Sequence, residues 1–123
     1  MTVFLFSDES LPLAGGDVLV RIVPPGIADK TSLLAWYSQS LDFPAWFGGN
    51  WDALSDCLSD LSWIAHSEIM IMHSDLPLET GSAEQRIYLD ILVDTVRSWR
   101  QDGQRQFKVL FPARFGGTLH TMG

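Results

Sequence analysis

The residues best placed for chemistry lie on one predicted helix, between residues 51 and 61. With roughly 100° between successive side chains, its apolar residues share one face, which we expect to pack on a sheet. These residues are Trp51, Ala53, Leu54, Cys57, Leu58 and Leu61. The opposite face carries only carboxylates and hydroxyls, from Asp52, Ser55, Asp56, Ser59 and Asp60. Such a face can bind cations, either metal ions or the basic side chains of a partner protein.

Of the two central carboxylates, Asp52 has a purely structural explanation and Asp56 does not. Asp52 stands in the first turn, where a carboxylate complements the helix dipole. Asp56 follows one turn later, and no lysine or arginine occurs between Lys30 and Arg86 to neutralise it. A like-charge pair at this spacing costs a helix only about 0.2–0.5 kcal/mol. The alternative that this face is simply solvated and has no function therefore remains.

The loop ahead of this helix adds aromatic side chains to the acidic face. Trp46 and Phe47 precede Gly48 and Gly49, and Asn50 is placed to cap the helix. Aromatic anchors beside a charged centre are typical of protein interfaces. For Trp46 and Phe47, a structural wedge between helices is an equally open interpretation.

Other residue patterns give little support for catalysis. His66 comes just before the strand predicted over 68–73 and His73 is its last residue, and the alternation of a strand sends them to opposite faces. An enzyme would have to use Asp52, Asp56 and a histidine to hold a divalent metal for hydrolysis, but no third ligand or general base is evident. We therefore expect no catalytic residue, no metal and no cofactor.

The overall charge favours a basic protein as the partner. The 123 residues include 15 acidic and 8 basic side chains, for a net charge of −7 at pH 7. Such a field repels nucleic-acid phosphates, so we expect no direct contact with nucleic acid. The single cysteine, Cys57, excludes an internal disulfide and reads as a small buried hydrophobe. The apolar run over residues 3–6 is too short to span a membrane, so we expect a cytoplasmic protein.

Strands alternating with helices must position the acidic helix. We predict helices over 29–41, 51–62 and 82–101, and strands over 17–23, 68–73 and 107–111. The first of these strands is mostly apolar, which predicts burial on both faces. This order is typical of the α/β class, with a small, mostly parallel three-stranded sheet and right-handed crossovers.

The two ends of the chain lie outside that pattern. Residues 1–6 form either an extra strand or a tail that packs on the domain. We expect one domain over residues 1–123, with a core of 17–111, an N-terminal extension of 1–16 and a C-terminal tail of 112–123. Gly116 and Gly117 predict mobility in that tail.

The segment from residue 47 to 58, FGGNWDALSDCL, resembles the central segment of the barstar family, intracellular inhibitors of secreted bacterial ribonucleases. The resemblance covers roughly residues 17–111 and implies a barstar-like fold. It implies that Asp56 is the main phosphate mimic in the active site of a basic ribonuclease or RNase-type toxin, with Asp52 as a second acidic contact. Trp46 and Phe47 would supply aromatic contacts, and Asn50 would order the loop. The chain would then be an immunity protein, monomeric when free.

Two positions depart from the family pattern. Ser55 stands where the best-known inhibitor of this type has a bulky aromatic residue, and Ser98 stands where an acidic contact is expected on the long last helix. Asp94, one turn earlier, is a candidate substitute. Gly48 and Ser59 complete the predicted partner-binding residues. The departures leave open an adaptor, which would bind another cationic protein without inhibiting a ribonuclease.

Overall fold

Four parallel strands form a single sheet in the order β1-β4-β3-β2. The computed structural model describes residues 3–8, 17–45 and 47–119. The strands are β1 Leu5–Phe6, β2 Val18–Val23, β3 Glu68–His73 and β4 Gln106–Phe111. The helices are α1 Lys30–Ser40, α2 Trp51–Asp60 and α3 Ala83–Asp102, then a 3₁₀ helix, Ala113–Phe115, and α4 Gly116–Leu119.

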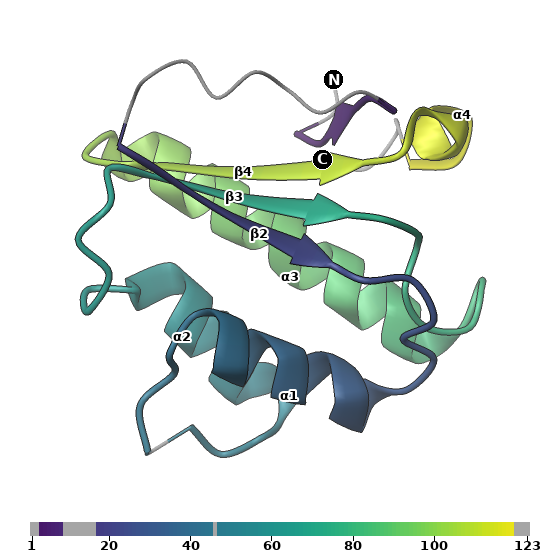
Figure 1. The fold of residues 1–123 in the computed structure, drawn as a ribbon, viewed down its shortest axis with the longest axis horizontal. Coiled ribbons are helices and arrows are strands. Elements are labelled where there is room, and N and C mark those ends of the chain that lie inside the picture. Colours follow the sequence, from purple (N-terminus) through teal and green to yellow (C-terminus); the bar gives the residue numbers. More distant parts are fainter. Residues whose placement is uncertain (1–2, 9–16, 46, 120–123) are drawn as a thin grey trace.

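The helices that connect the strands lie on one side of the sheet. Because β2, β3 and β4 are neighbours in chain order, right-handed crossovers place the helices between them on the same face. Figure 1 shows α3 running across the strands, with α1 and α2 on the side of α3 away from β4. The predicted α/β fold is confirmed. The N-terminal residues add a strand, in which Leu5 pairs with Leu110 and Phe6 with Phe111.

Each of the three long helices begins at a side chain that caps it. The Asp29 carboxylate accepts from the backbone N–H of Ser32 at 2.7 Å, and this bond lowers the pKa of Asp29. Ser82 accepts from the backbone N–H three residues further on. Gly103 ends α3 in the left-handed conformation, with φ of 72°, which an L-residue rarely adopts. The predicted starts at residues 29 and 82 are therefore confirmed, and α3 ends at Asp102, one residue beyond the predicted end at 101.

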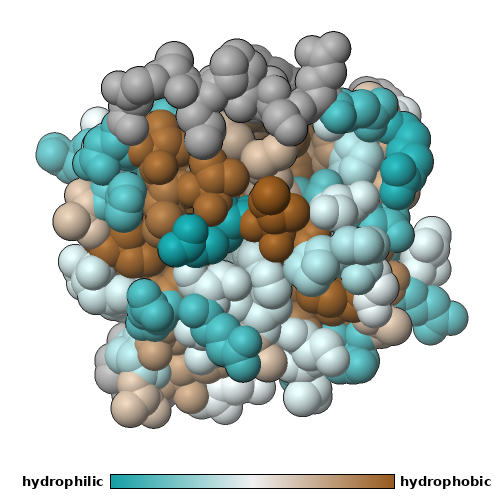
Figure 2. All heavy atoms as spheres, viewed as in Figure 1, coloured by the Kyte–Doolittle hydropathy of each residue, from teal (hydrophilic) through white to brown (hydrophobic). Residues whose placement is uncertain are grey.

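The prediction that β2 is buried on both faces was wrong. Within β2, Val23 alone is fully buried, and the side chain of Ile22 is 57% exposed. The reason is topological: β2 is an edge strand, and the helices cover only one face of it. In the same view, Figure 2 shows hydrophobic side chains at the surface in the region of β2. An apolar run predicted the strand correctly but could not say which strands flank it.

Gly116 and Gly117, which were expected in a flexible tail, lie in a short helix instead. Both glycines belong to α4, and Leu119 in the same helix is buried. A Cβ built on Gly116 would stand 3.7 Å from the Phe6 ring, so this helix packs closely against β1. Part of the expected tail is therefore structured. Residues 120–123 lie outside the described part of the chain.

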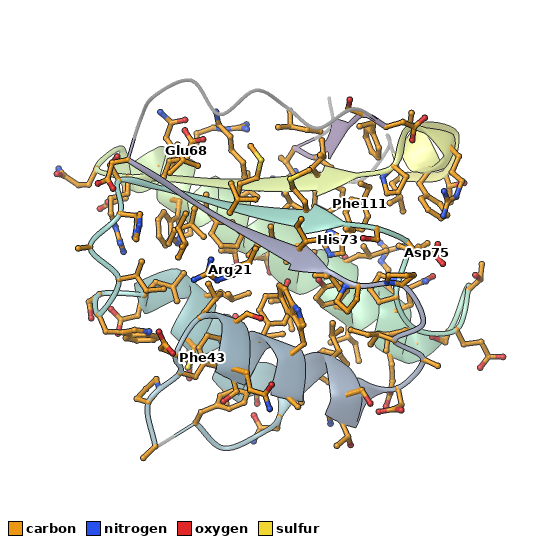
Figure 3. All side chains as sticks on the ribbon, in the orientation of Figure 1. Arg21, Phe43, Glu68, His73, Asp75 and Phe111 are labelled. Atoms are coloured by element: carbon orange, nitrogen blue, oxygen red, sulfur yellow. The ribbon has the colours of Figure 1, made fainter. Side chains whose placement is uncertain are left out.

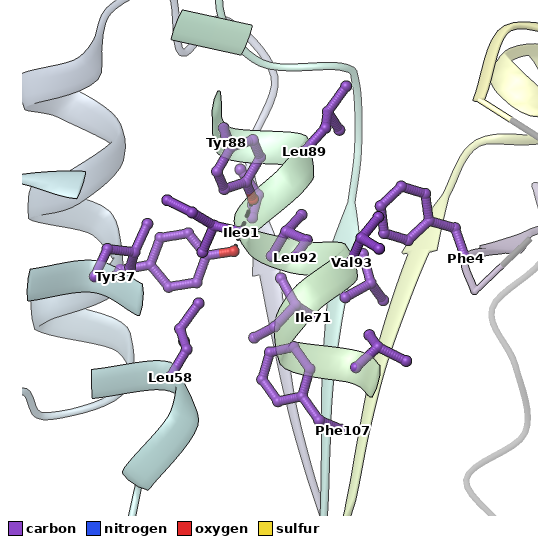
Figure 4. Packing of buried hydrophobic residues seen from close by; sticks show 14 of the residues in the cluster. Phe4, Tyr37, Leu58, Ile71, Tyr88, Leu89, Ile91, Leu92, Val93 and Phe107 are labelled. Carbon is purple, nitrogen blue, oxygen red and sulfur yellow. Dashed lines mark hydrogen bonds between the residues drawn. The ribbon is translucent and has the colours of Figure 1, made fainter. Parts of the chain in front are cut away.

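A buried chain of hydrogen bonds runs through the core and ties α1, α3, β3 and β4 together. The Tyr37 and Tyr88 hydroxyls are 2.7 Å apart, and Figure 4 shows Tyr37 reaching across to Tyr88. The Tyr88 hydroxyl is 2.7 Å from His73 Nε2, and His73 Nδ1 is 3.0 Å from the Leu110 carbonyl. His73 also stacks on Phe111, with ring centroids 4.1 Å apart (Figure 3).

The chemistry of its end groups fixes the direction of this chain. The Leu110 carbonyl can only accept, so His73 Nδ1 carries the hydrogen and donates it. A neutral imidazole then accepts at Nε2 from the Tyr88 hydroxyl, and the Tyr88 oxygen accepts from Tyr37. Burial lowers the pKa of His73 to about 4 and raises the pKa of both tyrosines. All three side chains are therefore neutral at pH 7, and each depends on its neighbour.

Candidate protein-binding site

The helix α2 has the two faces that its sequence predicts. Leu54, Cys57 and Leu58 are fully buried, and Leu61, just past the helix end, is buried with them. Burial, with Asp56 and Asp60 close by, raises the pKa of the Cys57 thiol to about 11, so it stays protonated. On the opposite face Asp52, Asp56, Ser59 and Asp60 are exposed, and Ser55 is half-buried. The acidic face is therefore available to a partner.

The start of α2 is fixed by Asn50 and the glycines before it. Asn50 Oδ1 accepts from the backbone N–H of Ala53 at 2.7 Å, as its predicted capping role requires. Gly49 has φ of +70°, a left-handed conformation that favours glycine. At Gly48 a Cβ would stand 3.5 Å from Asn50 Nδ2, within ordinary contact distance. The loop therefore needs glycine at residue 49, while residue 48 has room for a side chain.

We expect Asn50→Ala to lower the free energy of unfolding by about 1 kcal/mol, because the N–H of Ala53 loses its acceptor. Asn50→Asp is the matched control, since aspartate caps helices about as well as asparagine. Urea unfolding of both variants and the wild type measures the difference. Equal losses in the two variants would mean that the asparagine side chain does something other than capping.

The aromatic residues of the preceding loop are only partly free for a partner. Phe47 is half-buried and packs edge-on against Phe43, with ring centroids 4.8 Å apart. Phe43 in turn contacts Tyr37 and Trp63. Phe47 thus fixes the loop to the core and still exposes part of its ring next to Gly48. Trp46 lies outside the described residues.

No basic side chain among the described residues forms an ion pair with Asp52 or Asp56. The three ion pairs found there join Arg86 to Asp90, Lys108 to Glu68, and Arg114 to Asp75. Lys30 lies over the ring of Trp51 at the start of α2, with its Nζ 5.5 Å from the ring centre, but it is in none of these ion pairs. The sequence interval without lysine or arginine therefore corresponds to a surface of uncompensated negative charge.

The helix α3 brings further polar groups next to α2. Ser59 and Ser98 line the same small pocket of about 200 Å³, together with Asp60, Asp102 and Arg105. Asp94 is exposed one turn before Ser98 and is not part of this pocket. Asp102 was not among the predicted site residues, although it follows Ser98 by one helical turn, a spacing that signals a shared face.

Arg105 anchors the end of α2 rather than its acidic face. Its Nη2 donates to the carbonyls of Asp60 and Leu61 at 3.0 and 3.2 Å, and its Nη1 donates to the Ile64 carbonyl at 2.8 Å. Its guanidinium also covers Trp99, at 4.4 Å from the ring centre. The arginine therefore satisfies carbonyl groups at the helix end and, among the described residues, forms no ion pair with a carboxylate of α2.

The described residues offer no evident metal centre. In residues 3–8, 17–45 and 47–119, no group of three His, Cys, Asp or Glu side chains is close enough to hold an ion. His73 is committed to the buried hydrogen-bond chain. No helix in the same part of the chain is long and apolar enough to cross a membrane.

The structure thus describes a parallel α/β domain that presents an acidic, uncompensated helix face beside a half-buried aromatic residue. The model of the Barstar family, described as Barstar (barnase inhibitor), matches residues 18–112. The chain therefore belongs to the Barstar family, whose members are inhibitors. Comparison with curated proteins finds no match, and neither does comparison with solved structures.

Proposed function

We propose that this protein blocks the active site of a basic ribonuclease, or of an RNase-type toxin, with the acidic face of α2. One observation carries the proposal: on a helix of a Barstar-family chain, Asp52 and Asp56 are exposed and form no ion pair with any residue that the structure describes. A ribonuclease active site binds phosphate with arginine, lysine and histidine. Carboxylates on a rigid helix can stand where RNA phosphates would lie.

The residues around α2 have distinct roles in this proposal. Asp56, at the middle of the exposed face, is the main phosphate mimic, and Asp52 is the second. Asn50 holds the loop and the helix start in place, so the carboxylates are ordered before the partner arrives. The aromatic loop supplies apolar contact at the rim, from Phe47 and Trp46.

A second contact region lies where α3 meets α2. Ser59 and Ser98 share a pocket there, and Asp102 places a carboxylate beside the serine that departs from the family pattern. Asp94 adds an exposed carboxylate one turn earlier on α3. This arrangement supports a basic partner without an acidic residue at position 98. In a cell, the free protein would act as a monomeric, cytoplasmic immunity protein.

The direct test is a titration of purified ribonucleases, barnase among them, with the full chain. We expect RNA cleavage by the target enzyme to stop at one equivalent of this protein. The net charge of −7 should steer association, so the on-rate should fall about tenfold or more between low and high salt. Stopped-flow fluorescence measures this, with the double variant Asp52→Asn and Asp56→Asn as a control that should respond less to salt.

Two results would contradict inhibition and support a different function. Binding to a basic protein without protection of RNA would indicate an adaptor. Metal-dependent hydrolysis that disappears when Asp52 or Asp56 is replaced would indicate an enzyme.

A further inference from the structure

Positive charge in this acidic protein is concentrated in one short stretch. Four of its eight basic residues lie between positions 97 and 108, namely Arg97, Arg100, Arg105 and Lys108. Asp102 is the single acidic residue in that interval, so the stretch carries four positive charges and one negative charge in a chain of net charge −7. This stretch covers the end of α3 and the start of β4, which lie next to each other in the fold.

The end of α3 and the start of β4 enclose a cavity of about 220 Å³, which we call the basic pocket. Its apolar wall consists of Val96, Trp99 and Phe107, each nearly buried. The Trp99 and Phe107 rings lie 5.4 Å apart at 50° to each other. Arg100, Arg105 and Lys108 surround this wall, and no carboxylate is among the described residues that line the pocket.

The three cations of the basic pocket differ in how free they are. Arg105 is committed to the carbonyls at the end of α2 and to the Trp99 ring, so it forms part of the wall. Lys108 reaches Glu68 at 3.4 Å and remains 40% exposed, which makes this a weak pair. Arg100 is exposed and makes no ion pair or hydrogen bond with the residues that the structure describes. Arg100 is therefore ready to pair with an incoming anion.

We propose that the basic pocket binds an acidic segment of a partner protein that carries one apolar side chain. The volume suits a single leucine- or phenylalanine-sized group, which would lose its water against Trp99 and Phe107. Carboxylates on either side of that group would pair with Arg100 and Lys108. A nucleic acid fits less well than a short acidic segment, because a net charge of −7 repels every phosphate that Arg100 and Lys108 do not pair.

This inference does not depend on the proposed inhibition of a ribonuclease. Neither Asp52 nor Asp56 lines the basic pocket, and the charge that it would recognise has the opposite sign. The protein would thus have two charged surfaces of different specificity. A negative result for one surface would therefore not contradict the proposal for the other.

The test is titration of the ¹⁵N-labelled full chain with three capped peptides, followed by NMR. EDFDE carries both the acidic groups and the apolar anchor, QNFNQ carries only the anchor, and EDGDE carries only the charge. We expect EDFDE to shift the signals of residues 96–108, including the Trp99 indole N–H, and to bind more tightly than the other two peptides.

Two arginine variants test whether the position of the positive charge matters. Arg100→Gln should weaken EDFDE binding about three- to fivefold, the effect of losing one exposed ion pair. Arg86→Gln removes the same charge from an exposed site on the same helix and should leave binding unchanged. Circular dichroism checks that both variants fold, as their exposure leads us to expect.

Several results would overturn the proposal. These are no shifts at residues 96–108 with millimolar EDFDE, equal binding of QNFNQ or EDGDE, and equal weakening by the two arginine variants. If a ten-residue oligouridine shifted the same signals and bound more tightly than EDFDE, the pocket would be a nucleic-acid site instead.

Discussion

Asp56→Ala should weaken the complex with the target ribonuclease by about 30-fold or more while leaving the fold unchanged. A loss of about 2 kcal/mol defines a hot spot of a protein interface, and it corresponds to roughly that factor in Kd. Asp56 is exposed on α2 and forms no ion pair within residues 3–8, 17–45 and 47–119, so removing its carboxylate breaks no ion pair there. The whole effect should therefore appear in binding. Inhibition of RNA cleavage at varied inhibitor concentration measures it.

Two further alanine variants separate the role of Asp56 from that of net charge. Asp52→Ala should cost less affinity than Asp56→Ala. Asp52 lies in the N-terminal turn of α2, where the helix dipole already balances part of its negative charge. Glu79→Ala removes an exposed carboxylate from the loop before α3 and should change Kd little. If Asp56→Ala bound as tightly as the wild type, the acidic face of α2 would not be the site of inhibition.

Acidification from pH 7 to pH 4 should remove about 3 kcal/mol of stability through His73 alone. The pKa of this imidazole is about 4 in the folded protein and 6.5 when unperturbed, because burial disfavours the charged form. Between these values the unfolded chain binds a proton that the folded chain does not. The stabilisation is therefore complete above about pH 6.5 and is lost as the pH falls towards 4.

The variant His73→Gln isolates this effect from the titration of the many carboxylates. It should be less stable than the wild type at pH 7, because Tyr88 and the Leu110 carbonyl lose their imidazole partner. Its unfolding free energy should fall less steeply between pH 6.5 and 4, by about 3 kcal/mol over that range. Urea unfolding at a series of pH values measures both profiles. Parallel profiles would show that His73 is not held neutral in the core.

Local signals in the sequence predict most of the fold. Capping residues, such as Asn50 at the start of α2 and Gly103 at the end of α3, act on backbone groups a few residues away. Helix boundaries can therefore be predicted from nearby residues. What the sequence does not reveal depends on contacts between distant segments. The exposure of Ile22 follows from the edge position of β2, and the order of α4 follows from packing on Phe6.

The candidate site divides in the same way. The two faces of α2 follow from helical periodicity, and the exposure of Asp56 confirms that geometry. The pocket that joins Ser59 to Ser98 requires knowing how α3 crosses α2. The role of Arg105 is harder still to predict. Its hydrogen bonds to the carbonyls around Leu61 join residues more than forty positions apart, and no sequence pattern signals them.

The pairing of β1 with β4 also determines the order in which this protein can fold. Leu5 is synthesised well before its partner Leu110, which follows 105 positions later in the chain. Contacts so far apart in sequence are slow to form, because a long loop must close first. Until that closure, the Leu110–Phe111 end of β4 leaves N–H and C=O groups unpaired on the side where β1 comes to lie. The contact that covers this end of β4 is therefore slow to form, and until it forms the end is open to pairing with another chain.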